Sequence, residues 1–209
     1  MRHTFAVSIL ALYLGVASGC GAGRPSKYYQ LTIPGNVSSI AESHPYPVTL
    51  LLGPITSSDL YRGDRIVYSS EGHAIGTYEY QRWVDPPAQM IQDVLSRKLR
   101  TSGRYRGVHS WSSNARGDYR LRGKLYDFKE VSGATLVGRV TIELELRDSK
   151  TGATVWTHFY THDEPVSGKE VPAVVEALDR NVLLGVSEIM ASLDQYFSTH
   201  LPTNATASQ

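Results

Sequence analysis

Four side chains of types that commonly bind metal ions lie close together in the sequence, namely His158, His162, Asp163 and Glu164. The segment around them is typical of a strand, on which residues four apart share a face but stand about 13 Å from each other. One metal ion cannot bridge His158 and His162 over that distance, because its ligands lie roughly 2 Å away. The spacing therefore predicts an outward polar strand face and no metal site.

Other catalytic chemistry has equally little support in the sequence. It contains no Gly-x-Ser-x-Gly elbow, no phosphate-binding loop and no His-Glu-x-x-His run. His73 and His109 have no nucleophile beside them in sequence, and the carboxylates of Asp59 and Asp64 lie in a segment typical of solvated loops. We predict that the protein is not an enzyme, has no catalytic residues and needs no cofactor.

Tyr61, Arg62 and Arg65 combine the residue types that dominate the binding energy of protein interfaces. They lie in a segment that is too polar to be core, so we expect them to form a partner-binding surface together with the turn at 71–73. The alternative, which the sequence supports equally well, is an ordinary solvated loop with no partner.

Cys20 is the only cysteine among the 209 residues, and it follows a short apolar run. The run, 5–16, is about a dozen residues long, whereas a membrane-spanning helix needs about 20. Small residues precede the cysteine, and the whole segment resembles a bacterial lipoprotein box, in which the cysteine becomes the lipidated first residue of the mature protein. Two or more acyl chains anchor a protein stably, so we expect attachment to a membrane. The alternative is a plain secretory signal with an unpaired cysteine.

Gly21 and Ala22 follow the cysteine, where enteric bacteria place an aspartate to retain lipoproteins in the inner membrane. By this resemblance the protein is anchored in the outer membrane and faces the periplasm. The seven residues between Cys20 and Tyr28 reach at most about 25 Å. We therefore expect the folded domain to lie close to its bilayer.

Two amphipathic helices are expected to position the rest. The first begins after Trp83, with Asp85 as the N-cap, Pro86 at the first helical position and Gly103 in the left-handed conformation past the end. Trp83 is expected to pack the start of this helix against a sheet, with an exposed partner contact as the alternative.

The second helix closes the chain. Ser167 and Glu170 have the spacing of a capping box at its start. Gly185, in its middle, costs about 1 kcal/mol relative to alanine unless a neighbour packs closely there. Its expected core stripe consists of Val171, Val174, Val175, Leu178, Val182, Val186, Ile189, Leu193 and Tyr196.

Eight strand-like runs accompany the helices, four before the first helix and four after it. They cover 28–33, 48–52, 65–70, 76–80, 105–111, 119–128, 140–147 and 154–161. In the sixth run Arg120, Arg122 and Lys124 point one way, and Glu143 and Glu145 occupy matching positions in the seventh. Opposite charges at facing positions predict antiparallel neighbours. Such pairing on a solvated face explains the basic residues better than contact with lipid headgroups does.

These elements predict one α+β domain, with a largely antiparallel or mixed sheet and two long amphipathic helices on one of its faces. We expect a signal peptide at 1–19, the lipidated cysteine and a tether at 20–27, the domain at 28–198 and a disordered tail at 199–209. Without its first 19 residues the chain has 20 basic and 20 acidic side chains. This balance argues against a nucleic-acid partner.

Four short segments follow Cys20 in a fixed order, namely 28–31 (YYQL), 48–54 (VTLLLGP), 59–67 (DLYRGDRIV) and 80–87 (YQRWVDPP). Together they resemble the ABC-type transport auxiliary lipoprotein family, which includes the paraquat-inducible lipoproteins. The resemblance covers about residues 28–197. It implies an outer-membrane lipoprotein that works with an ABC permease complex and a mammalian-cell-entry-domain protein in moving lipids or other apolar molecules between membranes.

In this interpretation the protein is a docking or tethering component and not an ATPase, and its self-association stays open. Two other classes also remain. One is a lipoprotein that binds and regulates a cell-wall or other envelope enzyme, and the other is an envelope hydrolase with a dispersed active site.

Overall fold

The computed structural model describes residues 24–33, 46–70 and 74–200. It contains the expected order of four strands, a helix, four strands and a helix, with one short 3-10 turn. The elements are β1 (Lys27–Tyr29), β2 (Tyr46–Ser57), η1 (Asp59–Tyr61), β3 (Arg65–Ser69), β4 (Ile75–Trp83), α2 (Pro87–Thr101), β5 (Tyr105–Ser110), β6 (Tyr119–Ser132), β7 (Leu136–Asp148), β8 (Thr154–Pro165) and α3 (Val171–Thr199).

Strand β6 is the axis of the sheet because it pairs along both of its edges. On one edge it pairs with β7, and β7 pairs with β8, both antiparallel. On the other edge the first half of β6 pairs with β2 and the second half with β3, both parallel. Beyond β2 lies β5, and beyond β3 lie β4 and β1. The sheet is therefore mixed, and it divides into two arms on one side of β6.

The predicted pairing of the sixth and seventh runs is confirmed. Arg122 lies opposite Glu145 and Lys124 opposite Glu143 in the β6–β7 register. Strands β3 and β4, which follow each other in the chain, also pair antiparallel. Several strands are longer than the predicted runs. Strand β8, for example, stays paired with β7 as far as Pro165, although its last residues are polar.

The first strand is shorter than predicted. It ends at Tyr29, and Leu31 is buried outside the sheet. The backbone N–H of Thr32 donates a 2.8 Å hydrogen bond to Oδ1 of Asp179 in α3. The chain therefore leaves the sheet edge to meet the helix.

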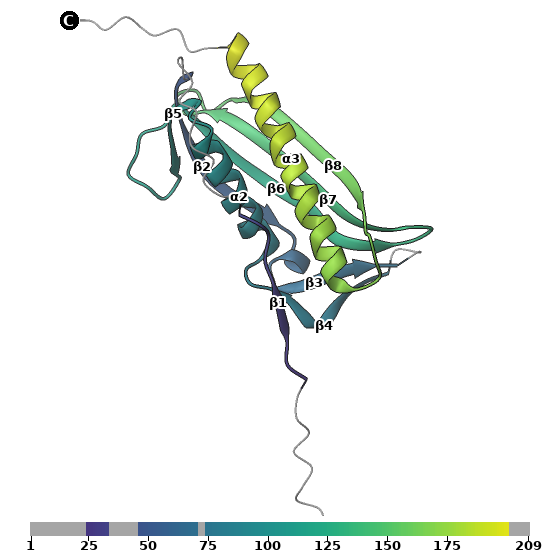
Figure 1. Ribbon diagram of the computed structural model, residues 1–209. Coiled ribbons are helices and arrows are strands. Elements are labelled where there is room, and N and C mark those ends of the chain that lie inside the picture. Colours follow the sequence, from purple (N-terminus) through teal and green to yellow (C-terminus); the bar gives the residue numbers. More distant parts are fainter. Residues whose placement is uncertain (1–23, 34–45, 71–73, 201–209) are drawn as a thin grey trace, which may run out of the picture.

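Both helices lie on the same face of the sheet, as predicted (Figure 1). Helix α2 packs on β2 and β5, α3 packs on β7 and β8, and the two helices touch each other. In the described part of the chain no helix is long and apolar enough to cross a membrane.

The predicted helix starts are wrong by a few residues. Helix α2 begins at Pro87 with Pro86, not Asp85, at the N-cap. Helix α3 begins at Val171, and Glu170 is itself the N-cap in an extended conformation, so the Ser167 capping box does not form. In each case a proline occupies one of the first two helical positions, where its missing N–H costs nothing. The predicted helix end is confirmed, since Gly103 has φ of 66°.

Two features fasten α3 to the sheet. A Cβ at Gly185 would lie 2.7 Å from the ring of Tyr160. The absence of a side chain at this glycine therefore lets the tyrosine ring pack closely against the helix, which explains a glycine in mid-helix. Asn181 is fully buried, accepts a 2.7 Å hydrogen bond from the Tyr160 hydroxyl and donates to the carbonyls of Gly138 and His162 at 2.8 Å. Burial raises the pKa of Tyr160, so its hydroxyl stays a donor.

The core stripe of α3 differs from the prediction at its two ends. Val171 is only partly buried, and Phe197 rather than Tyr196 is fully enclosed. The Phe197 ring packs against Tyr105 and Tyr119, with centroids 5.7 and 5.3 Å away. Aromatic packing across the sheet therefore decides which ring turns inward.

Candidate functional site: an exposed loop and the open face of the sheet

The segment from Asp59 to Arg65, here called the 59–65 loop, begins with the turn η1 and ends at β3. Its outer side carries an ion pair of 2.8 Å between Arg62 Nη1 and Asp59 Oδ1, whose side chains are 72% and 87% exposed. Arg65 and Leu60 are both exposed. The loop thus presents charged side chains around one leucine, which a partner could contact.

Tyr61 points the other way and is buried in the core. Its hydroxyl lies 3.4 Å from Oδ1 of Asp127. The same carboxylate oxygen forms an ion pair of 2.5 Å with Nζ of Lys129. Burial, together with the Asp127 charge, raises the pKa of Tyr61 to about 12. The interpretation that this whole segment is too polar for the core is wrong at Tyr61, because one side of the 3-10 turn faces the core and Tyr61 lies on that side. Tyr61 holds the loop on the sheet and cannot touch a partner.

Asp64 joins the loop to the neighbouring strand β4. Its carboxylate accepts a 2.7 Å hydrogen bond from Arg82 Nη1, and its carbonyl accepts a 2.5 Å bond from the N–H of Trp83. The backbone beneath the exposed arginines is therefore firmly connected to the sheet.

Trp83 is buried, as its predicted packing role requires. The indole packs against Phe128 on β6 with ring centroids 5.2 Å apart. The alternative of an exposed partner contact is wrong, because the ring has almost no accessible surface. Of the four residues considered for partner binding, only Arg62 and Arg65 remain on the surface, and their partner role stays a prediction.

Two other predicted features lie outside the described residues. They are the lipidation site Cys20 and the turn 71–73. Both stay predictions.

The histidines and carboxylates near the end of β8 pair with different partners. His158 Nε2 lies 3.1 Å from Glu188 Oε1, and its ring stacks on Trp156. Asp163 accepts two 2.6 Å hydrogen bonds from Arg139, which lower the pKa of its carboxyl. Over residues 24–33, 46–70 and 74–200, no three His, Cys, Asp or Glu side chains converge as a metal site would require.

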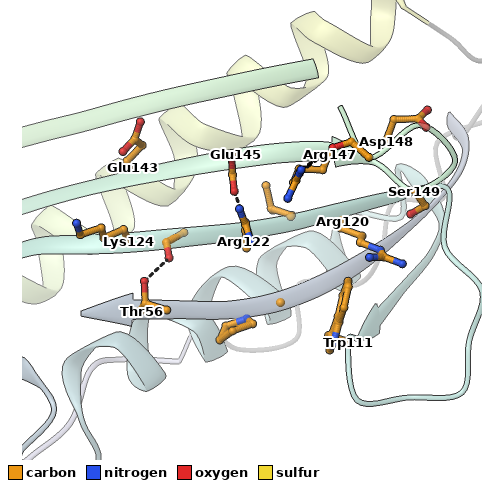
Figure 2. A pocket seen from close by; sticks show the side chains of 15 residues that line it. Thr56, Trp111, Arg120, Arg122, Lys124, Glu143, Glu145, Arg147, Asp148 and Ser149 are labelled. Atoms are coloured by element: carbon orange, nitrogen blue, oxygen red, sulfur yellow. Dashed lines mark hydrogen bonds and ion pairs between the residues drawn. The ribbon is translucent and has the colours of Figure 1, made fainter. Parts of the chain in front are cut away.

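A groove of about 760 Å³ crosses the face of the sheet opposite the helices, between β2, β6 and β7 (Figure 2). Its polar side chains alternate along the strands with the apolar ones that face the helices. Trp111, which directly follows β5, forms one wall. The basic side chains of β6 stand out in the sequence, but the groove itself could not be predicted, because only the tertiary pairing brings Trp111 and β2 alongside them.

The sequence profile of the ABC-type transport auxiliary lipoprotein component matches residues 29–190. The chain belongs to this family. No curated protein matches the auxiliary lipoprotein. Its fold is similar to that of a Xanthomonas campestris protein of the DUF330 family, with a TM-score of 0.72 and 18% identity over 84% of this chain and 100% of that one. A second solved structure, of an uncharacterized protein, has a TM-score of 0.63 and 14% identity over 81% of this chain and 99% of that one.

The matched range of the auxiliary lipoprotein contains both the 59–65 loop and the groove. Cys20 precedes it. The family resemblance noted in the sequence is thus confirmed, and the two solved structures support the α+β fold alone.

Proposed function

We propose that this protein is a membrane-anchored docking lipoprotein of an ABC-type transport system that moves lipids or other apolar molecules across the cell envelope. The observation that carries the proposal is the match over residues 29–190 to a family described as an auxiliary lipoprotein component of ABC-type transport. The lipoprotein box at Cys20 supplies the expected anchor in the outer membrane. The partners we propose are the permease complex and a mammalian-cell-entry-domain protein.

Two features support a docking role over a catalytic one. The exposed ion pair and arginines of the 59–65 loop are held on a backbone tied to β4, as suits a preformed contact surface. The family is also described as an auxiliary component. We accordingly propose that the protein has no enzymatic activity of its own.

Co-purification tests the proposal. The full-length lipoprotein, solubilised from its own membranes in mild detergent, should recover the permease, its ATPase and the entry-domain protein. Recovery of a cell-wall synthase in place of these proteins would favour the alternative of an envelope-enzyme regulator and contradict the transport role.

A further inference from the structure

The groove contains an exception to the charge pairing of β6 and β7. Arg122 faces Glu145 across the strands and is hydrogen-bonded to its carboxylate. At the next outward position Arg120 lies directly opposite Arg147. Like charges at directly opposed positions of an antiparallel pair destabilise the sheet. For the stability of the sheet alone, an acidic residue in place of one of these two arginines would be more favourable.

Both arginines have contacts, but these leave their charge unneutralised. The Arg120 guanidinium lies over the Trp111 ring, 4.2 Å from its centroid, and Arg147 donates hydrogen bonds of 3.0 and 2.6 Å to the carbonyl of Gly152. Within the described part of the chain neither arginine has an ion pair with a carboxylate. Asp148 lies next in sequence, but its Oδ1 accepts three hydrogen bonds from the following turn.

These features share one end of the groove. Figure 2 shows Arg120, Arg147 and Ser149 at the same end, and Lys124 near the other. Ser149 also lines the groove, but its hydroxyl oxygen is buried and is not counted as a ligand group. Two arginines without an ion pair among the described residues thus line one end of the groove.

We propose that this end of the groove binds a phosphate-type oxyanion, with Arg120 and Arg147 as its ligands. Guanidinium groups bind such oxyanions through paired N–H donors, and these charge-assisted bonds are stronger than neutral ones. Trp111 holds the Arg120 side chain in place, which reduces the conformational entropy lost on binding. A bound dianion would also remove the repulsion between the two arginines.

The size of the groove suits a phosphate carried on a larger molecule as well as a free one. Its volume of about 760 Å³ lies within the range of roughly 300 to 1,000 Å³ typical of sites for organic ligands. A lipid headgroup and inorganic phosphate present the same oxyanion to the arginines. This anion site does not require the proposed transport role, so a failure of co-purification would leave it intact.

The test is calorimetric titration of the full lipidated chain in non-ionic detergent, with inorganic phosphate and then with phosphatidic acid in mixed micelles. We expect wild type to bind at least one probe, more weakly as salt concentration rises. Equal affinity for the two probes would identify free phosphate as the ligand. Tighter binding of phosphatidic acid would identify a headgroup. Either result supports the site.

Arg147→Glu is the decisive variant, because it places a carboxylate opposite Arg120 and should leave the fold at least as stable. Its affinity for the bound probe should fall at least tenfold, the loss expected for about 1.4 kcal/mol. Arg139→Gln is a control for the loss of a cation from the same face of β7, since Arg139 pairs with Asp163 outside the groove.

Three results would overturn the proposal. They are no binding of either probe by wild type, undiminished binding by folded Arg147→Glu, and an equal loss in Arg139→Gln.

Discussion

Two buried aromatic side chains of this lipoprotein, Tyr61 and Trp83, hold neighbouring exposed segments on the sheet. Tyr61 and Trp83 both lie in segments with many polar neighbours, yet both are buried. Trp83 joins β4 to β6 through Phe128, and Tyr61 joins the 59–65 loop to Asp127. Removing either ring should therefore affect stability first and partner binding second.

Trp83→Ala should lower the free energy of unfolding by about 3 to 5 kcal/mol, the usual cost of truncating a buried large aromatic. Equilibrium urea unfolding measures this change. Trp111→Ala is the matched control, because the Trp111 side chain is 47% exposed and its loss should cost far less. Equal stability of Trp83→Ala and wild type would contradict the anchoring role.

Tyr61→Phe should change how stability depends on alkaline pH. The pKa of Tyr61 is raised from 10.0 to about 12, so the folded state holds this proton more tightly than the unfolded chain does. Its contribution is fully present below pH 10 and is lost as pH rises toward 12. Wild type should lose on the order of 2 kcal/mol more than Tyr61→Phe over this interval. Parallel stability curves of the two proteins, measured by urea unfolding, would contradict the raised pKa.

At the scale of elements, helix α3 depends on close contact with β8 and on one buried amide. Gly185 lets the Tyr160 ring approach the helix backbone, and Asn181 hydrogen-bonds that tyrosine and two strand carbonyls. This docking brings together segments that the chain order separates, and it covers the helix side of β7 and β8.

Gly185→Ala tests the contact. Alanine has a better helix propensity by about 1 kcal/mol, but its methyl group would lie 2.7 Å from a ring that has no room to move. Overpacking of this kind costs about 1 to 3 kcal/mol, so we expect a net loss of stability of roughly 1 kcal/mol. Leu184→Ala, at an exposed neighbouring position, should change the melting temperature little. A clear gain of stability in Gly185→Ala would show that the helix is not held against Tyr160.

The whole molecule presents a covered face and an open face. Helices α2 and α3 lie on one side of the sheet (Figure 1). The groove lies on the other side (Figure 2). The groove therefore lies on a face of the sheet that the two helices leave uncovered.

Cys20→Ser should release the protein from the membrane. The substitution removes the thiol that we expect to carry the acyl chains and lies outside the folded domain. The variant should therefore appear in the soluble periplasmic fraction with an unaltered circular dichroism spectrum. Fractionation with immunodetection provides the measurement. Persistent sedimentation of the variant with membranes at high salt would refute lipid anchoring.

Arg62→Glu combined with Arg65→Glu should weaken association with the periplasmic partner of the transporter. Both side chains are exposed, so stability should stay within about 0.5 kcal/mol per site. Quantitative pull-down compares the double variant with wild type.

Arg116→Glu combined with Lys169→Glu makes the same change of charge at exposed positions elsewhere and is the control. Equal retention of the partner by a folded Arg62 and Arg65 variant would move the interface away from the loop.

Local pattern in the sequence determined the order of elements, the antiparallel pairing of β6 with β7, the amphipathic helices and the family. These features depend on the spacing of apolar residues within a segment and on charges in consecutive segments, such as Arg122 and Glu145. Both kinds of pattern can be read along the chain. Tertiary structure alone decided the parallel pairing of β2 and β3 with β6, because no turn in the sequence joins those strands. It also decided that Tyr61 turns inward and that Arg120 meets Arg147, since burial and register depend on contacts between distant segments.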